Sequence, residues 1–209
     1  MKTNNTVNNK QTFIVGVTGG IGCGKTTVTN LFAAKGIDIV DADLVAREVV
    51  VPGSQGLSEL VSQFGDNILD EKKALDRAAL RTLIFADNNA KVVVNKILHP
   101  LIRENMLNQL INTKSQYCIL SAPLLFENKL QTLVNRTLVI DIPETLQLER
   151  TMSRDGGNIE TIKSIMRAQI SREKRLALAD DIIDNSKTIN FLKPQVNVLH
   201  LKYMTLASK

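Results

Sequence analysis

Short apolar runs alternate along the chain with stretches in which apolar residues recur every three or four positions. Continuous apolar runs of this length are typical of buried strands, and the longer period is typical of helices. Their alternation predicts an α/β fold, with a mostly parallel sheet and crossover helices. We expect strands at residues 12–18, 37–41, 117–122, 136–142 and 181–184. Helices are expected at residues 25–35, ending before Gly36, and from Ile189 to the C-terminus.

The segment between the second and third predicted strands contains no strand-like run. An ordinary crossover is much shorter, so we interpret residues 42–114 as an inserted helical lobe that binds the second substrate. Its helical stretches are residues 42–50, 56–64, 76–85 and 88–112. Within the last stretch, His99-Pro100 follows a helix that we expect to end at Leu98, because the residue before a proline disfavours helical geometry.

A second insertion, residues 150–175, follows the fourth predicted strand. Residues 149–175 carry seven basic side chains against four acidic ones, and Asp155-Gly156-Gly157-Asn158 separates two helical patterns. A cationic helical hairpin beside a phosphate site is typical of a lid that closes over a nucleotide. The core then comprises residues 1–41, 115–149 and 176–209.

Arg150 and Arg154 lie one turn apart on one face of the first lid helix, where both can reach a bound phosphate. The other lid cations have a simpler explanation, because half of any surface helix is polar. We therefore assign three of them to a solvated face: Lys163, Lys174 and Arg175.

The composition is that of a soluble globular protein, with 44% hydrophobic and 22% charged residues. A net charge of +5 suits an acidic partner, which a polyphosphate substrate explains as well as nucleic acid does. The absence of Trp argues against stacking on nucleic-acid bases. No apolar run is long enough for a membrane span, and residues 1–11 are expected to be a frayed tail without a signal-peptide core. Two cysteines without disulfide or metal spacing indicate a reducing cytoplasm.

The segment from Gly19 to Thr27 reads Gly-Gly-Ile-Gly-Cys-Gly-Lys-Thr-Thr and joins the first predicted strand to the first helix. This spacing and context predict a P-loop, in which backbone N–H groups and a helix start hold a di- or triphosphate. Lys25 is expected to reach the β- and γ-phosphates, and the Thr26 hydroxyl is expected to bind Mg²⁺. The other nucleotide-binding positions of the loop are Gly22, Cys23, Gly24 and Thr27.

Cys23 has two interpretations. In the first, the backbone amides of the loop that bind anions favour the thiolate over the thiol, which makes Cys23 sensitive to oxidation. We favour the second interpretation, a small residue that the loop tolerates, because a reactive thiol needs an exposed electropositive setting.

Acidic residues end several predicted strands, at the edge where open α/β sheets bind ligands. Asp41 ends the second strand, Asp43 falls in the first turn of the next helix, and Arg47 lies one turn further on. The two carboxylates suit acceptance of a hydroxyl proton and support of the metal's water ligands. The alternative is a purely structural role for these residues, as a helix N-cap and a weak surface ion pair between Asp43 and Arg47. Glu127 follows the third strand. Asp141, near the end of the fourth, either resembles a Walker B aspartate or caps a turn.

Taken together, these motifs resemble the dephospho-coenzyme A kinase family over about residues 13–206. The resemblance rests on the loop and on a series of segments in family order: Asp41-Ala42-Asp43 with Arg47, Val50-Val51-Pro52-Gly53, His99-Pro100-Leu101-Ile102, Pro123-Leu124-Leu125-Phe126-Glu127, Arg150 with Arg154-Asp155, Gln169, Ala179-Asp180 and Ile183-Asp184-Asn185. Two departures are visible. Cys23 stands where serine is usual, and Ile165 stands where many members carry a lid arginine.

The resemblance implies a three-layer P-loop kinase core with a five-stranded parallel sheet, an inserted helical lobe that binds the coenzyme, and a helical lid. It implies transfer of the ATP γ-phosphoryl group to the ribose 3′-hydroxyl of dephospho-coenzyme A, with Mg²⁺. Asp43 is then the expected base, and Lys25 and Arg150 act on the transferring group. Arg154 and Asn185 are expected to contact the nucleotide. The residues expected to contact the coenzyme are Asp43, Arg47, His99, Arg103 and Glu127. Thr26 and Asp41 are expected at the metal.

Three alternatives remain open: another small-molecule kinase, a nucleic-acid-binding ATPase and a non-catalytic nucleotide sensor. Basic residues are mixed with acidic ones outside the lid, which disfavours the second. A sensor would lack a catalytic group, and none is missing. We expect a cytoplasmic enzyme, a monomer or weak homo-oligomer, with no nucleic-acid or membrane partner.

Overall fold

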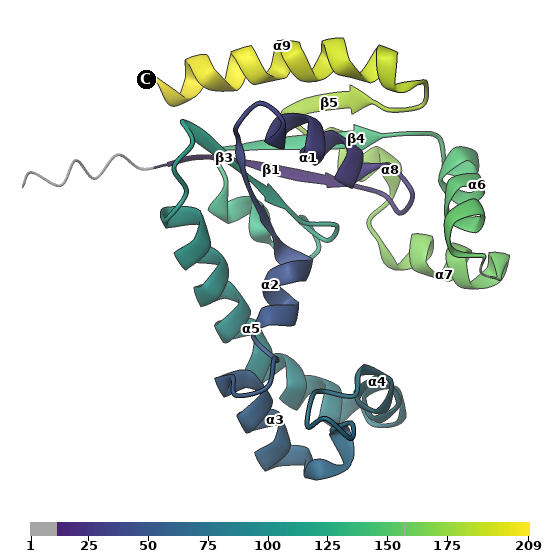
Figure 1. The fold of residues 1–209 in the computed structure, drawn as a ribbon. Coiled ribbons are helices and arrows are strands. Elements are labelled where there is room, and N and C mark those ends of the chain that lie inside the picture. The colour runs from purple at the N-terminus through teal and green to yellow at the C-terminus, as the bar shows by residue number, and fades with distance from the viewer. Residues whose placement is uncertain (1–11, 157) are drawn as a thin grey trace, which may run out of the picture. The chain divides into compact units, whose positions relative to one another are not determined.

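A computed structural model describes residues 12–156 and 158–209. In this part of the chain, five strands form one sheet in the order β2-β3-β1-β4-β5 (Figure 1). They are β1 (Phe13–Gly19), β2 (Asp38–Asp41), β3 (Tyr117–Ser121), β4 (Arg136–Asp141) and β5 (Asp181–Asp184). Strand β1 pairs in parallel with β3 and β4, and β4 pairs in parallel with β5. The predicted sheet is confirmed, whereas the predicted tail at residues 1–11 lies outside the described residues.

Most helices lie close to their predicted bounds, but the segment interpreted as a two-helix lid ends in a third, short helix that was not predicted. The helices are α1 (Lys25–Ala33), α2 (Ala42–Glu48), α3 (Gln55–Phe64), α4 (Arg77–Ala86), α5 (Asn88–Ile111), α6 (Glu144–Asp155), α7 (Ile159–Ala168), α8 (Arg172–Ala177) and α9 (Ile189–Ala207), with short 3₁₀ helices η1 (Asp66–Ile68) and η2 (Leu130–Leu133). Gly36 follows α1 with φ 81°, the left-handed geometry expected after a helix end. Within the described residues, no helix is both long and apolar enough to cross a membrane.

The main hydrophobic core lies between the sheet and two helices, α1 and α9, that cover one of its faces (Figure 1). Val15 and Val17 of β1 are fully buried there, and the rings of Phe32 and Tyr203 stack with centroids 6.2 Å apart. Burial of such side chains contributes roughly 1.5–3 kcal/mol each. This packing fixes β1 and α1, the two elements that the phosphate loop connects.

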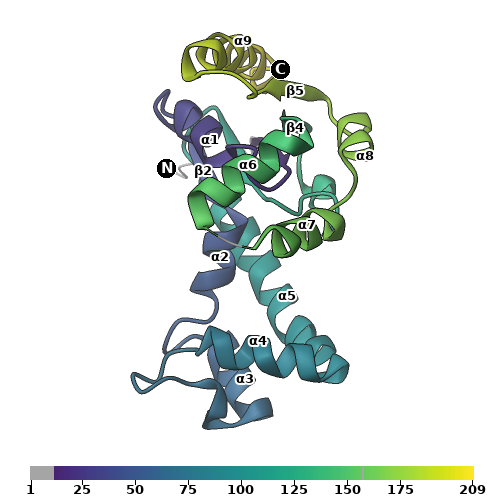
Figure 2. The same cartoon turned by 90° about the vertical axis from the view of Figure 1, so that its right-hand side faces the viewer.

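The structure divides into two compact units. The first comprises the described residues up to Ile39 together with Leu110–Lys209, and the second is Val40–Gln109. The second unit is helical around its own core of Val49, Val50, Leu60, Ile68, Leu80 and Val94. Its bounds differ by a few residues from the predicted lobe at 42–114. Residues 150–175 belong to the first unit, where α6 and α7 lie side by side (Figures 1 and 2); closure of this lid stays a prediction.

The predicted helix end at Leu98 is wrong. Helix α5 continues through His99-Pro100, and Pro100 lies inside it. A proline in a helix interior costs about 3 kcal/mol, because one backbone hydrogen bond is lost. Buried side chains on both sides of the proline, Val94 and Met106, offset this cost, since both require the helix to continue.

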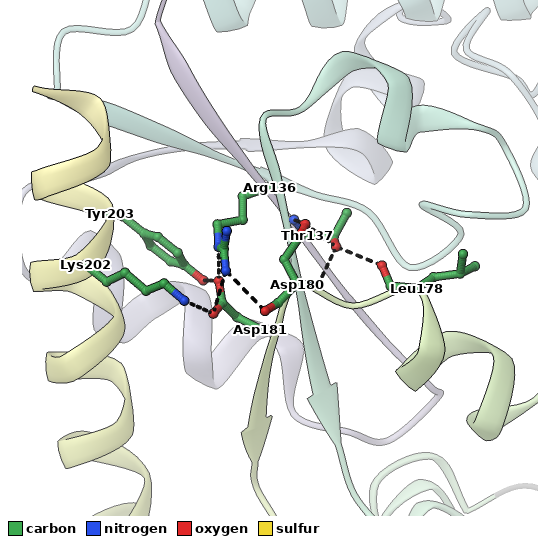
Figure 3. A network of polar contacts seen from close by, with 7 residues as sticks. All are labelled: Arg136, Thr137, Leu178, Asp180, Asp181, Lys202 and Tyr203. Atoms are coloured by element: carbon green, nitrogen blue, oxygen red, sulfur yellow. Dashed lines mark hydrogen bonds and ion pairs between the residues drawn. The ribbon is translucent and has the colours of Figure 1, made fainter. Parts of the chain in front are cut away.

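A polar network joins the first residues of β4 and β5 to α9 (Figure 3). The Asp181 carboxylate, whose side chain is 6% exposed, accepts hydrogen bonds from Arg136 Nε at 2.5 Å, Lys202 Nζ at 2.6 Å and Tyr203 Oη at 3.1 Å. Burial by itself raises the pKa of this carboxyl, but the three donors outweigh burial and hold the pKa below its ordinary value.

Asp181→Asn should lower the free energy of unfolding by about 2–3 kcal/mol at pH 7, because Arg136 and Lys202 lose their carboxylate. This value lies at or below the usual cost of breaking a buried ion pair because Lys202 is 41% exposed. The folded-state pKa is lowered, so the contribution is complete above the unfolded pKa of about 3.9 and is lost as the pH falls through the folded value. Urea unfolding should therefore show a smaller gap between the two proteins at pH 3 than at pH 7. A gap independent of pH would contradict the role of the charge.

Candidate active site

The phosphate loop, residues 19–27, connects β1 to α1, so the predicted strand–loop–helix context is confirmed. Two of its glycines have positive φ, 72° at Gly22 and 83° at Gly24, where other residues are strained. Space is restricted as well. A Cβ on Gly22 would lie 2.6 Å from the Thr151 hydroxyl, and a Cβ on Gly24 would collide with the Asn185 amide. Both positions therefore require glycine.

Side chains from distant parts of the chain hold the loop backbone. Asn185, buried just after β5, donates from Nδ2 to the Cys23 carbonyl at 2.8 Å. The Ile21 N–H donates to Gln169 Oε1 at 3.1 Å. Asn185 thus shapes the loop, and its predicted contact with nucleotide stays a prediction.

Lys25 begins α1, and its Nζ donates to the hydroxyl of Ser121 at the end of β3, at 2.6 Å. Thr26 and Thr27 are exposed in the first helical turn. Among the described residues, no side chain caps α1 and no acidic residue lies in that turn. The N–H groups and the positive end of the helix dipole therefore face the loop, which is the arrangement that binds phosphate.

The two arginines assigned to phosphate from the sequence have different surroundings. Arg150 is half-buried on α6, and its Nη1 donates to the Asn185 carbonyl at 3.0 Å. Arg150 is thereby joined, through Asn185, to the loop. Arg154 is exposed and pairs with the adjacent Asp155 at 2.7 Å. Its predicted contact with nucleotide stays a prediction.

The assignment of Arg175 to a solvated face is wrong. This α8 side chain is 6% exposed, and its Nη2 donates to the Ile170 carbonyl at 2.9 Å. Its Nη1 would lie 3.0 Å from a Cβ on Gly20, so the guanidinium packs against the loop. Lys163 and Lys174 are exposed, as predicted.

Gln147 is a further residue beside the loop that was not identified from the sequence. It is 4% exposed on α6, donates from Nε2 to the Ile142 carbonyl at 3.3 Å, and its side chain fills the space where a Cβ on Gly20 would lie. Gln147 lies three residues before Arg150, so the two side chains are neighbours on the surface of the helix. This spacing is the sequence signal that could have placed Gln147 beside the loop.

Glu127, after β3, and Asp141, the last residue of β4, both contact residues that follow α7. Glu127 Oε1 accepts the Ile170 N–H at 2.9 Å. Asp141 pairs with Arg172 through two hydrogen bonds of 2.8 and 2.5 Å. This ion pair is a third role for Asp141, beyond the two considered from the sequence. Substrate binding by Glu127 stays a prediction.

Cys23 is 3% exposed, with its sulfur against Gly19. Burial raises the pKa of the thiol, and the Lys25 N–H and the positive charges of Lys25 and Arg175 only partly offset this effect. A buried, protonated thiol reacts slowly. The structure therefore favours the small residue that the loop tolerates over the oxidation-sensitive thiolate.

The predicted base and all the predicted coenzyme-binding residues except Glu127 lie in the second unit. Asp41 Oδ1 accepts the N–H groups of Asp43 at 2.9 Å and Leu44 at 3.3 Å, which makes Asp41 the N-cap of α2. The cap proposed as a structural alternative therefore exists at Asp41, while the Asp43 side chain is exposed in the first turn. The other predicted coenzyme-binding residues of this unit are also exposed: Arg47 on α2, and His99 and Arg103 on α5.

The residues present fit the magnesium ion of a P-loop site. In the described ranges no group of three or more His, Cys, Asp or Glu side chains could hold a metal ion. P-loop proteins do not need such a cage, because one hydroxyl, the substrate phosphates and water bind Mg²⁺. The exposed Thr26 supplies that hydroxyl.

A parallel sheet, a glycine loop between its first strand and helix, and a lysine at the helix start define a P-loop nucleotide-binding protein. Comparison with known proteins narrows this class. The dephospho-CoA kinase family model matches residues 13–190, so the chain belongs to that family and is a kinase.

Individual relatives agree with the family assignment. The chain is 51% identical over 195 residues to a dephospho-CoA kinase of Shewanella oneidensis, covering 93% of this chain and 95% of the relative. It is 48% identical over 203 residues to that of Pseudoalteromonas translucida, covering 97% of each. A solved dephospho-CoA kinase from Campylobacter jejuni is similar in structure, with a TM-score of 0.70 and 28% identity, over 92% of this chain and 97% of the other.

Proposed function

We propose that the protein transfers the γ-phosphoryl group of ATP to the ribose 3′-hydroxyl of dephospho-coenzyme A, forming coenzyme A and ADP. The observation that carries this proposal is the glycine loop with Lys25 at the start of α1, in a chain matched by the kinase family over residues 13–190. We further propose that the protein acts in the cytoplasm as a monomer or weak homo-oligomer, without a nucleic-acid or membrane partner.

Phosphoryl transfer spreads negative charge over the oxygens of the moving group, so positioning and cations supply most of the catalysis. We assign this charge to Lys25 and Arg150. Their attachments support the assignment, because Ser121 orients the first and the Asn185 carbonyl orients the second. Arg154 is exposed and its pair with Asp155 is local, so it can exchange that partner for a nucleotide phosphate.

When bound, Mg²⁺ neutralises charge on the nucleotide phosphates. The Thr26 hydroxyl is its proposed protein ligand, and Asp41 is proposed to support its water molecules. Oδ1 of Asp41 caps α2, which fixes the carboxylate at the carboxyl end of β2.

The acceptor hydroxyl needs a base that takes its proton, and Asp43 is the proposed base. It is held at the start of α2 by the Asp41 cap, with its own side chain exposed toward solvent. The exposed cations of the second unit, with the carboxylate after β3, are proposed to bind the coenzyme: Arg47, His99, Arg103 and Glu127. Closure of the lid would exclude water, which otherwise competes as acceptor.

The direct test supplies the purified protein with ATP, Mg²⁺ and dephospho-coenzyme A and measures coenzyme A by chromatography. We expect coenzyme A and ADP in equal amounts. Adenosine, AMP and shikimate serve as alternative acceptors in parallel reactions. ATP consumption with one of these, and none with dephospho-coenzyme A, would overturn the proposal in favour of another small-molecule kinase.

A further inference from the structure

The connection between α7 and α8, residues 169–171, is fixed at three points, and we refer to it as the strap. The Gln169 side chain accepts the Ile21 N–H of the phosphate loop at 3.1 Å. The Ile170 N–H donates to Glu127 at 2.9 Å, and the Ile170 carbonyl accepts from Arg175 at 2.9 Å. Both backbone groups of Ile170 are thus satisfied by charged side chains, which form stronger hydrogen bonds than neutral partners do.

The strap contacts the part of the loop that has no helical support. Cys23 and Gly24 lead into α1, but Gly20 and Ile21 precede that helix. Arg175 packs against Gly20, and Gln169 binds Ile21. The first half of the loop is therefore held by the strap and by α8, together with Gln147 of α6 beside Gly20.

A phosphate site is strong when its donors are already oriented before the ligand arrives, because binding then costs less ordering. A glycine-rich segment loses more conformational freedom on ordering than other segments do. In this loop, the Gln169–Ile21 hydrogen bond and the Arg175–Gly20 contact limit that freedom in the folded protein.

We propose that Gln169 and Glu127 are positioning residues for nucleotide binding: Gln169 holds the first half of the phosphate loop, and Glu127 holds the strap that carries Gln169. For Glu127 this is an indirect role through Ile170, separate from the proposed contact with the coenzyme. This inference rests on one part of the proposed function, the binding of a nucleotide to the loop. It does not depend on which acceptor is phosphorylated.

Calorimetric titration with ADP and Mg²⁺, without any acceptor, tests the role of Gln169. Gln169→Leu leaves the Ile21 N–H without its partner and should weaken ADP binding roughly 3- to 30-fold. Gln116→Leu is the matched control. Gln116 also forms a hydrogen bond with the backbone, as the donor from Nε2 to the Met204 carbonyl at 3.0 Å, so this variant should lose stability without losing ADP affinity.

A double-mutant cycle tests the link through the strap. Glu127→Leu should also weaken ADP binding, and its effect should be smaller in the Gln169→Leu background, since both changes release the same segment. Glu127→Gln keeps an oxygen acceptor for the Ile170 N–H and should restore most of the affinity. If Gln169→Leu lowers the melting temperature but binds ADP within twofold of wild type, or if the two effects add independently, the proposal is overturned. Absence of coenzyme A formation by the wild type, with ADP binding intact, would instead count only against the proposed acceptor.

Discussion

Replacing Lys25 by alanine should lower kcat at least about 10²–10³-fold, the typical cost of removing one group that stabilises transition-state charge. The Lys25 ammonium is the cation at the start of α1, held by the Ser121 hydroxyl. Folding should change little, since a partly buried side-chain hydrogen bond such as that to Ser121 contributes about 1 kcal/mol. Steady-state kinetics with saturating ATP and dephospho-coenzyme A, together with thermal unfolding, measure the two effects separately.

Lys35→Ala is the matched control, because Lys35 is an exposed lysine just after the same helix. We expect its kcat and its melting temperature to remain close to those of the wild type. A Lys25→Ala protein that unfolds at the assay temperature would count against the assignment, because Lys25 would then serve the core. Unchanged kcat in a folded variant would remove Lys25 from the catalytic groups.

The sheet and the phosphate loop could be predicted because their signals are local. Strand β3 is a continuous apolar run that ends before Pro123, and its residues are all buried. In the loop, Gly22 and Gly24 have backbone angles that other residues adopt at a cost, so their spacing specifies the geometry directly. A short window of sequence contains all the information that these elements need.

Tertiary burial decided the elements that were predicted wrongly. Pro100 signals a helix end, yet α5 continues because buried residues on both sides outweigh the lost hydrogen bond. In α8, four charged residues follow one another, and their order does not indicate that Arg175 turns inward. The guanidinium is buried because the Ile170 carbonyl and the loop surround it, and neither lies within the local pattern.

The side-chain contacts that hold the phosphate loop could not be predicted from local sequence patterns either. Gln169 and Ile21 are 148 residues apart in sequence, and Asn185 and Cys23 are 162 apart. Gln169 and Asn185 were noticed through the family resemblance, which indicates importance without indicating a contact. A side-chain amide can bind substrate, backbone or water, and only the fold decides among them.

The Asp43 side chain is exposed in the first turn of α2, in the second unit. Asp43→Asn should lower kcat about 10²–10⁴-fold, the usual contribution of a general base. Binding of ATP should change little, since asparagine keeps the size and the helical position. Single-turnover kinetics should show the loss in the chemical step, which separates it from slow product release.

Asp87→Asn is the control within the same unit, since Asp87 is likewise an exposed aspartate near the start of a helix. Its turnover should equal that of the wild type. The Asp41 cap of α2 accepts the N–H of residue 43, which asparagine retains, so Asp43→Asn should not unfold α2. A large loss of turnover with unchanged helicity and unchanged ADP affinity therefore isolates proton transfer, whereas unchanged turnover would remove Asp43 as the base and require another acceptor for the 3′-hydroxyl proton.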